Sequence, residues 1–350
     1  MSFSTEGFGL NKQNKEIHIY TIENSNGTSM KLTDMGASLV SFEIADIDNN
    51  KLDVVLGLKS GEFYELHNWD AMGATIGRNA NRISGHSFEL SGQRYVLADN
   101  ARGSNIHSGP DMYFSRLWDV AHVKTPEGEG VCFSLFSPDG DQGMPGNLDI
   151  NVTYVLTEDN ELIITYDGIC DKDTIINMTN HSYFNLNGHS SGNVDEHMLQ
   201  INADRVMYSE DGNMSNQEIH DVSGTVYDFR KLTRLNTYNA LYDNNFCLND
   251  YNGDIRWVSA LVSEQSGLRM DVYTDTCGLQ VYNVGKLNNR FSPKGDAHYI
   301  PRNGIALETQ FYPDAVNHPE YASPVVKAGD KYHSRTVYKF SIVNEVNHEG

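Results

Sequence analysis

Hydrophobic and polar residues alternate with period two in many short segments of this chain. Such alternation is typical of β-strands that bury one face and expose the other. Turn residues separate the segments, and both Ser91-Gly92 and Glu158-Asp159-Asn160 divide a longer alternating stretch into a hairpin. The predicted strands lie within Lys15–Glu23, His86–Leu97, Leu148–Cys170, Leu268–Tyr273, Leu279–Val284 and Thr336–Val343.

Helical periodicity is scarce by comparison. Two short stretches, Glu62–Trp69 and Leu235–Asp243, each predict a single helix. The glycines and prolines are scattered along the chain, and no low-complexity or charged linker divides it. We therefore expect one all-β domain over residues 1–350, built as a large antiparallel β-sandwich with two or more stacked sheets.

Composition narrows the classes of function. The 350 residues are 39% hydrophobic, enough for a large core, and 26 Lys and Arg against 47 Asp and Glu give a net charge of −21. A surface of that sign repels nucleic-acid phosphates and anionic lipids, so we expect neither nucleic acid nor a membrane as a partner.

The four cysteines, Cys132, Cys170, Cys247 and Cys277, are widely spaced and form no C-x-x-C pair. This spacing argues against a zinc ribbon and against a disulfide framework. The N-terminus resembles no secretory signal, and no run of 18 apolar residues occurs. We therefore expect a soluble, cytoplasmic protein.

The most polar of the strand-like segments is Asn177–Gly188, which reads NMTNHSYFNLNG. It follows the apolar pair Ile175-Ile176 and surrounds His181 with amides and hydroxyls. Each such group must find a partner if it is buried, or cost roughly 1–3 kcal/mol. The hydroxyls of a sugar would supply those partners, and a histidine can exchange protons near neutral pH.

Three further segments carry candidate chemistry, and each also has a purely structural interpretation. Gly77–Ile83 holds two arginines and two asparagines, which fit either a ligand site or a turn with two surface ion pairs. His107 lies beside turn residues and could equally be a surface loop residue. Glu308 follows Ile305-Ala306-Leu307, so it is either a buried carboxyl with a raised pKa or a strand residue that points to solvent.

Few features of the sequence indicate a metal site or a nucleotide site. The chain has no P-loop, no H-E-x-x-H, no G-x-S-x-G and no G-x-G-x-x-G motif that opens a helix. His181, His189 and His197 recur every eight residues, but an extended strand would spread them over about 50 Å, at roughly 3.3 Å per residue. We therefore expect no metal site.

Taken together, these segments show that the chain resembles the aldose 1-epimerases (galactose mutarotases). The resemblance extends from about Glu16 to Phe340. The motifs that carry it, in the order of the chain, are GRNANRI, the turn Asn105–His107, SPDGDQGMPGNL, NMTNHSYFNLNG, DNNFC at Asp243–Cys247, GLQVY and LETQFYPDAVN. The resemblance implies a β-sandwich of the galactose mutarotase type that acts without a cofactor on the anomeric carbon of free sugars.

The same resemblance implies roles for individual residues. The general base falls on Glu308, the general acid on His181, and a second active-site histidine on His107. Contacts to the hydroxyls of the sugar fall on Asn81, Arg82, Asp243 and Gln280. The chain departs from the family pattern at Ser108, at Asp111–Arg116 and at Tyr242, which we expect at the rim of the pocket.

The expected reaction needs one base and one acid that flank O1 and the ring oxygen of the sugar. We expect attraction between Glu308 and His181 to keep both charged, while His107 and Arg82 stabilise negative charge on oxygen. Tyr183 or Phe311 could stack on a sugar face. We thus expect the substrate to be a small aldose such as glucose or galactose, and the protein to be a monomer or a homodimer. The alternatives are a non-catalytic sugar-binding or regulatory protein on this fold, or an epimerase for a disaccharide or a hexose 6-phosphate.

Overall fold

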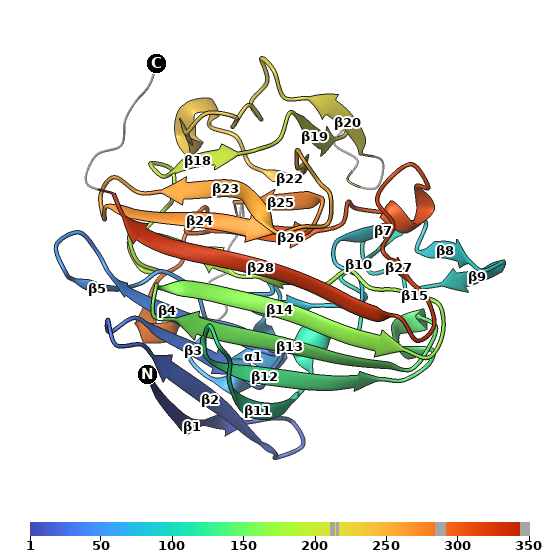
Figure 1. Cartoon of the computed structure of the whole chain (residues 1–350), viewed down its shortest axis with the longest axis horizontal. Helices are drawn as coiled ribbons and strands as arrows, with labels where there is room; N and C mark the ends of the chain where they lie inside the picture. Colours follow the sequence, from blue (N-terminus) through green and yellow to red (C-terminus); the bar gives the residue numbers. More distant parts are fainter. Residues whose placement is uncertain (211–213, 215–216, 284–291, 344–350) are drawn as a thin grey trace.

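The computed structural model describes residues 1–210, 214, 217–283 and 292–343. Within these residues the chain folds into β-sheets whose strand pairings are antiparallel (Figure 1). The prediction of an all-β, antiparallel fold is therefore confirmed. None of the helices in the described part of the chain is long and apolar enough to cross a membrane.

The largest sheet has nine strands and runs across the front of Figure 1. In spatial order its strands are β11 (Asp119–Lys124), β12 (Gly128–Ser137), β13 (Leu148–Thr157), β14 (Glu161–Cys170), β28 (Lys331–Ile342), β24 (Leu268–Thr274), β23 (Arg256–Val262), β18 (Met198–Ile201) and β21 (Thr233–Arg234).

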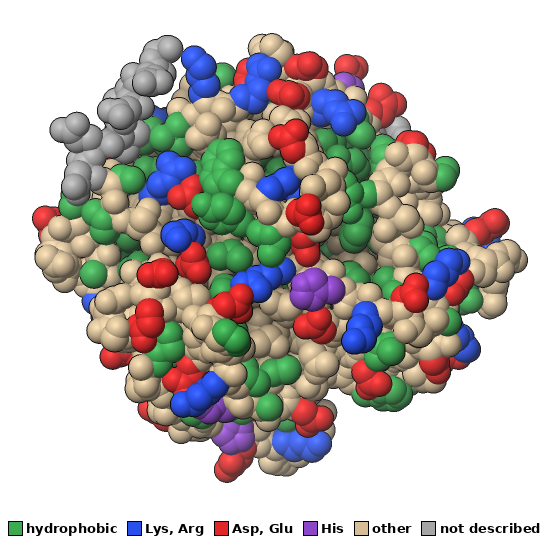
Figure 2. Space-filling view, in the orientation of Figure 1, with side chains coloured by type: hydrophobic (Ala, Val, Ile, Leu, Met, Phe, Trp, Pro, Cys, Tyr) green, Lys and Arg blue, Asp and Glu red, His purple; other side chains and the backbone are tan. Residues whose placement is uncertain are grey.

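The nine-stranded sheet shows the expected period of two. Along β24 and β28 buried positions alternate with partly or fully exposed ones, because successive side chains point to opposite faces of a strand. The outer positions carry ion pairs such as Lys339–Glu161 at 2.9 Å and Arg269–Asp271 at 2.6 Å. Figure 2 shows acidic and basic side chains interspersed over this face, so the negative net charge does not gather into one field there.

Two smaller sheets complete the main architecture. The six-stranded sheet consists of β17 (Tyr183–Phe184), β26 (Ile305–Gln310), β25 (Gly278–Tyr282), β22 (Asp243–Cys247), β19 (Arg205–Tyr208) and β20 (Glu218–Asp221). The five-stranded sheet consists of β1 (Ser2–Leu10), β2 (Glu16–Glu23), β3 (Ser29–Thr33), β4 (Ser38–Ala45) and β5 (Lys51–Asp53).

The hydrophobic core lies where the three sheets meet. Its main cluster includes Phe42 of the five-stranded sheet, Leu307 of the six-stranded sheet and Phe340 of the nine-stranded sheet, all essentially inaccessible to solvent. The Phe42 and Phe340 rings stack with centroids 4.5 Å apart, and the Tyr338 hydroxyl donates a 2.9 Å hydrogen bond to the Leu307 carbonyl. A core built from both ends of the chain agrees with one domain, which stays a prediction.

Short elements fill the edges of the sandwich. Four two-stranded pairs join β6 (Ala74–Ile76) to β16 (Thr179–His181), β7 (Arg82–Ser84) to β10 (Ser104–Ile106), β8 (Ser87–Leu90) to β9 (Gln93–Val96), and β15 (Thr174–Ile175) to β27 (Val325–Val326). The helical elements are the α-helix α1 (Gly61–His67) and the 3₁₀ turns η1 (Tyr113–Ser115), η2 (Asp141–Gly143), η3 (Leu235–Tyr238), η4 (Lys294–Asp296) and η5 (Ala315–Asn317).

The predicted strands are confirmed, with boundaries shifted by a few residues in places. The segment His86–Leu97 forms the hairpin β8–β9, and Leu148–Cys170 forms β13 and β14. Val284, the predicted end of β25, lies outside the described residues. The helix at Glu62–Trp69 is confirmed as α1, but the helix at Leu235–Asp243 is wrong. Only Leu235–Tyr238 makes a 3₁₀ turn, and β22 starts at Asp243, where strand pairing overrides the local pattern.

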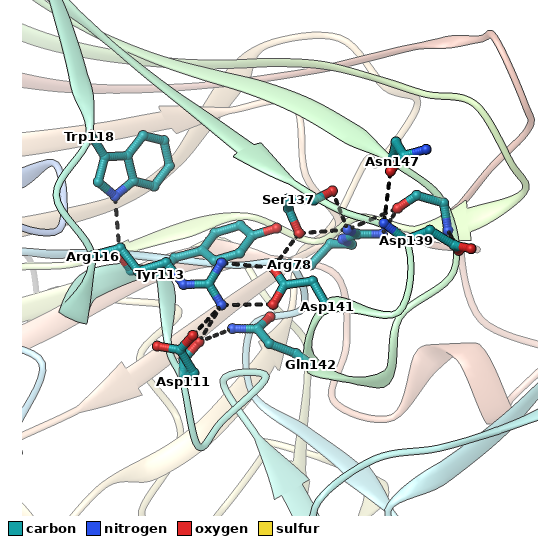
Figure 3. A network of polar contacts seen from close by, with 11 residues as sticks. Arg78, Asp111, Tyr113, Arg116, Trp118, Ser137, Asp139, Asp141, Gln142 and Asn147 are labelled. Atoms are coloured by element: carbon teal, nitrogen blue, oxygen red, sulfur yellow. Dashed lines mark hydrogen bonds and ion pairs between the residues drawn. The ribbon is translucent and has the colours of Figure 1, made fainter.

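Arg78 is the largest side chain that the fold buries completely (Figure 3). Its guanidinium donates hydrogen bonds to the carbonyl of Pro145 at 2.7 Å, to the Ser137 hydroxyl at 2.7 Å and to the Thr174 hydroxyl at 3.1 Å. It thereby joins the chain before β7 to the loop 137–148. The expectation of a surface ion pair is wrong for Arg78, because its partners are neutral oxygens inside the protein.

We expect Arg78→Met to lower the free energy of unfolding by roughly 3–5 kcal/mol, because buried oxygens would lose their donor. Arg78→Lys should restore only part of this loss, since an ammonium cannot reproduce the planar fork of donors. Denaturant unfolding measures both effects. The control is Arg94→Met, which removes an exposed arginine with one exposed hydrogen bond to Ser87. Equal losses in Arg78→Met and Arg94→Met would contradict the assignment.

Candidate active site

A cavity of about 250 Å³ opens beside the six-stranded sheet. It is lined by all seven residues that the sequence analysis proposed for the site: Asn81, Arg82, His107, His181, Asp243, Gln280 and Glu308. It is also lined by Trp69, Asp70, Ala71, Ile106, Met112, Phe114, Tyr183 and Tyr282. The fold thus brings together side chains that are up to 239 positions apart in the sequence, from Trp69 to Glu308.

The floor of this cavity is set by the register of three strands. Gln280 of β25 lies directly opposite Glu308 of β26, and Asp243 of β22 lies opposite Tyr282. Because side chains alternate along β26, Leu307 points into the core while Glu308 faces the cavity. Glu308 is only 2% exposed, so its interpretation as a strand residue that points to solvent is wrong.

His181 is held beside Glu308 by the short strand β16. Its carbonyl accepts a 3.0 Å hydrogen bond from the Gly73 N–H, and the neighbouring Asn180 amide donates to the Gly73 carbonyl at 2.9 Å. The Nε2 atom of His181 lies 3.5 Å from Oε1 of Glu308. The two side chains are 8% and 2% exposed, so their contact is almost fully screened from water.

His107 is positioned by reciprocal hydrogen bonds with Asn81. The Asn81 N–H donates to Nδ1 of His107 at 3.2 Å, and the His107 N–H donates to the Asn81 carbonyl at 3.1 Å. Both residues have left-handed backbones, with φ of 60° and 52°. Because Nδ1 accepts a hydrogen bond, a neutral His107 carries its proton on Nε2, where it can donate to a ligand. His107 therefore lines the cavity and is not a surface loop residue.

Burial moves the pKa values of the central pair toward their neutral forms. It lowers the pKa of His181 to about 4 and raises that of Glu308 well above its ordinary value, with the nearby Asp243 raising it further. Arg82 opposes part of the shift of the Glu308 pKa. Desolvation therefore opposes the expected attraction between the two charges, and it favours a protonated Glu308 and a neutral His181.

Burial also shifts the pKa values of His107 and Asp243, which flank the central pair. It lowers the pKa of His107 well below the ordinary histidine value, and the nearby His181 and Arg82 lower it further. It raises the pKa of Asp243, which Arg82 and a 2.6 Å hydrogen bond from the Gln280 amide partly offset. His107 is thus a neutral donor, while Asp243 and Gln280 form one connected polar unit on the floor.

Several buried polar atoms of the cavity lining have no hydrogen-bond partner in the described part of the chain. They are Asp70 Oδ2, His181 Nδ1, Gln280 Oε1 and Glu308 Oε2. Buried polar atoms are rarely left without partners in native proteins. A ligand that brings several hydroxyl groups would satisfy them.

The polar segment Asn177–Gly188 divides its groups between scaffold and cavity. His181 and Tyr183 line the cavity, whereas Asn177, Asn180 and Asn185 bind backbone groups. The amides therefore position the histidine and do not face the ligand. The strand-like segment is also interrupted, because β16 pairs with β6 whereas β17 pairs with β26.

His189 and His197, which follow His181 at intervals of eight residues, contact different parts of the protein. His197 Nε2 accepts the Leu186 N–H at 3.0 Å, and His189 Nδ1 lies 3.0 Å from the Tyr299 hydroxyl. Among the described residues, no group of three or more His, Cys, Asp or Glu side chains is arranged to hold a metal ion.

The rim of the cavity is only partly where the sequence placed it. Met112 and Phe114, within Asp111–Arg116, line the cavity as expected. Ser108 and Tyr242, which were also expected at the rim, do not line the cavity. Ser108 is buried and accepts the Asn79 N–H, and Tyr242 packs in the core. Phe311 lines a different cavity.

The sequence analysis missed five lining residues, which are Trp69, Asp70, Ala71, Ile106 and Tyr282. For Tyr282 a signal existed, because it lies two positions after Gln280 and so on the same face of β25. Trp69 and Asp70 follow α1 in a turn whose position depends on tertiary packing. No local pattern would have placed them at the cavity.

Comparison with known proteins agrees with this geometry. The family model described as Aldose 1-epimerase matches residues 18–339. The chain is 36% identical to the aldose 1-epimerase of Haemophilus influenzae, covering 92% of this chain and 95% of that protein. It is also 36% identical to the galactose mutarotase of Homo sapiens, covering 88% and 89%.

Solved structures show the same fold. A GalM/aldose epimerase homologue from C. elegans superimposes with a TM-score of 0.85 at 29% identity, covering 93% of this chain and 99% of that one. The galactose 1-epimerase of Lactobacillus acidophilus gives a TM-score of 0.83 at 26% identity, covering 98% and 99%. The fold is thus a β-sandwich of the galactose mutarotase type, and the chain belongs to the aldose 1-epimerase family of carbohydrate isomerases.

Proposed function

We propose that this protein interconverts the α and β anomers of free hexoses such as glucose and galactose, with Glu308 as the base and His181 as the acid. The observation that carries the proposal is the 3.5 Å contact between Glu308 and His181 in a buried cavity. A base and an acid at that distance can serve two oxygens on one carbon, which is the arrangement of O1 and the ring oxygen at C1.

Ring opening then follows as a concerted proton transfer. Ionised Glu308 takes the proton of the C1 hydroxyl, and the electrons of that O–H bond form the carbonyl C1=O1. The bond between C1 and the ring oxygen breaks, and the ring oxygen takes a proton from protonated His181. Each positioned transfer contributes about 10²–10⁴-fold to the rate. The products are an open-chain aldehyde, a protonated Glu308 and a neutral His181.

Ring closure reverses these transfers after the C1–C2 bond rotates. The ring oxygen attacks the other face of the aldehyde and gives its proton to His181, while Glu308 returns a proton to O1. The pair holds one proton in total before and after ring opening, so the cycle needs no exchange with solvent. The neutral pair that burial favours has the same protonation state as the pair beside the open-chain sugar.

The surrounding residues have supporting roles in this proposal. Arg82 lowers the pKa of Glu308 and so favours the ionised base that ring opening requires. Neutral His107, with its proton on Nε2, can donate to an oxygen that gains negative charge. Asn81, Asp243 and Gln280 are proposed to hold the other hydroxyls of the sugar, for which Gln280 Oε1 is available as an acceptor.

The alternative functions fit the cavity less well. A phosphate-bearing hexose is disfavoured because the described lining residues include three carboxylic acids, Asp70, Asp243 and Glu308, against one arginine, Arg82, and no lysine. A sugar-binding protein without activity needs no base beside an acid. Calorimetric binding of glucose without faster mutarotation would favour that second interpretation.

We expect Glu308→Gln to lower kcat for mutarotation by about 10²–10⁴-fold, because the amide cannot accept the C1 hydroxyl proton. Polarimetry on freshly dissolved α-D-glucose and α-D-galactose measures the rate above the uncatalysed background. Glu129→Gln is the matched control. Glu129 is also a buried glutamate, but it pairs with His122 and Lys124 on the nine-stranded sheet and should be dispensable for activity. Undiminished catalysis by a folded Glu308→Gln variant would contradict the role of the base.

The pH dependence of kcat/KM should form a broad plateau. On the acid side the pair gains a second proton as pH falls through the lowered pKa of His181, about 4, while Glu308 stays protonated, so the base is lost. On the alkaline side the pair loses its last proton as pH rises through the raised pKa of Glu308, so the acid is lost. Rates corrected for spontaneous mutarotation test this profile. An acid limb near pH 6.5, the ordinary histidine value, would contradict it.

A further inference from the structure

Asp70 lines the cavity but takes no part in the proton transfers between Glu308, His181 and the sugar. Its side chain is partly buried, and its Oδ2 atom is fully buried without a hydrogen-bond partner in the described part of the chain. Burial alone raises the pKa of this carboxyl to about 6. Near pH 7 Asp70 is therefore mainly ionised, and a partly buried charge without a counter-ion is unfavourable.

Arg82 is the only Lys or Arg among the described residues that line the cavity. It partly offsets the raised pKa values of Asp243 and Glu308, the other two carboxylic acids of the lining. It has no such effect on Asp70, whose pKa is shifted by burial alone. Of the three carboxylic acids, Asp70 is thus the one that lacks a positive neighbour.

Aromatic side chains lie beside Asp70 in the cavity lining. The Tyr183 hydroxyl donates a 2.8 Å hydrogen bond to the Asp70 carbonyl, and the Tyr183 and Tyr282 rings have centroids 6.1 Å apart. Burial raises the pKa of Tyr282 to about 12, and the nearby Asp243 and Asp70 raise it further. Trp69, the preceding residue, lines the same cavity. A carboxylate beside aromatic rings suits an ammonium group, which it binds by a charge-assisted hydrogen bond and by cation–π attraction.

The turn that carries Asp70 is fixed by hydrogen bonds on both sides. The Asn68 side chain accepts the Met72 N–H at 2.7 Å and donates to the Met72 carbonyl at 3.1 Å. The Ala71 N–H donates to the Asn68 carbonyl at 3.1 Å. Because the backbone is already held in place, Asp70 loses little conformational entropy when it binds a ligand.

We propose that the cavity accepts a protonated amino sugar as a substrate, and that Asp70 is the counter-ion of its ammonium group. The inference rests on the proposed function, because the amino sugar must still present its free C1 to Glu308 and His181. An ammonium group that replaces one hydroxyl changes the size of a hexose very little. It would donate to Oδ2 of Asp70, the atom that has no partner. The net charge of −21 would favour the approach of a cation.

The kinetic test compares 2-amino-2-deoxyglucose and 6-amino-6-deoxyglucose with glucose near pH 7. For one of the amino sugars we expect kcat/KM to be about tenfold higher than for glucose, mainly through KM, because a hydrogen bond between two charged groups is stronger than one to a neutral hydroxyl. The preferred isomer identifies the carbon that faces Asp70. In Asp70→Asn, which keeps an acceptor oxygen but no charge, the ratio should fall to about one.

The control is Asp48→Asn. It removes the same charge from an exposed position outside the cavity, so the ratio should stay unchanged.

A pH profile tests the charge of Asp70 without any substitution. The ratio of kcat/KM for the amino sugar to kcat/KM for glucose should fall as pH drops through the pKa of Asp70, about 6, because the protonated carboxyl no longer attracts the ammonium group. Glucose itself should show no such fall, since a protonated carboxyl can still exchange hydrogen bonds with a hydroxyl. Tyr183 and Tyr282, which face Asp70, stay neutral in this range because burial raises their pKa values, and the pKa of His181 lies lower, at about 4.

Calorimetry on the Glu308→Gln variant separates binding from catalysis. The hydrochloride of the preferred amino sugar should bind about tenfold more tightly than glucose. This preference should vanish in the double variant Glu308→Gln/Asp70→Asn.

The outcomes distinguish the two proposals. Mutarotation of glucose without preference for either amino sugar, or a preference that survives Asp70→Asn, would overturn the role of Asp70 and leave the proposed function intact. An amino sugar that binds through Asp70 but is not mutarotated would overturn its assignment as a substrate. Mutarotation of no sugar at all by the wild type would refute the proposed function, and calorimetry would still decide whether Asp70 binds an ammonium group.

Discussion

The contact between Glu308 and His181 is the interaction on which the account of this protein depends. Two titratable groups lie 3.5 Å apart with almost no access to water. Such a pair would destabilise a fold that did not need it, because each charge loses its hydration. Here the cost is limited because the pair can exist in a neutral form, with the proton on Glu308. Burial thus holds the pair one proton transfer away from the ionised form that the proposed mechanism requires.

The pairing of the surrounding strands fixes the positions of Glu308 and His181 relative to each other. The register of β22, β25 and β26 places Asp243, Gln280 and Glu308 on one face, while the opposite face of β26 packs against the nine-stranded sheet. β16 brings His181 to the same place through its pairing with β6. Neither element could be displaced alone without exposing core residues. Among the buried side-chain atoms without a partner in the described part of the chain, Asp70 Oδ2, His181 Nδ1, Gln280 Oε1 and Glu308 Oε2 line the cavity, where the hydroxyls of a sugar would bind.

The sequence predicted the strands and the members of the site better than the electrostatics and the rim. Period-two alternation located β13, β14 and β28 because one face of each is exposed. Glu308 was recognisable because it follows three apolar residues. The sequence did not reveal the burial of Arg78 or the neutral forms of Glu308 and His181, because these depend on neighbours that are distant in sequence. Trp69 was missed because it lies in a turn, where the pattern carries no information about the partner across the cavity.

The most direct test of the central claim is a double-mutant cycle on Glu308→Gln and His181→Asn, measured as kcat for the mutarotation of galactose. A base and an acid that pass the same proton act as one unit, and removing either disables the other. The account predicts that the double variant is within about twofold of the slower single variant. Losses that multiply in the double variant would show that the two residues act independently, and would contradict the shared-proton mechanism.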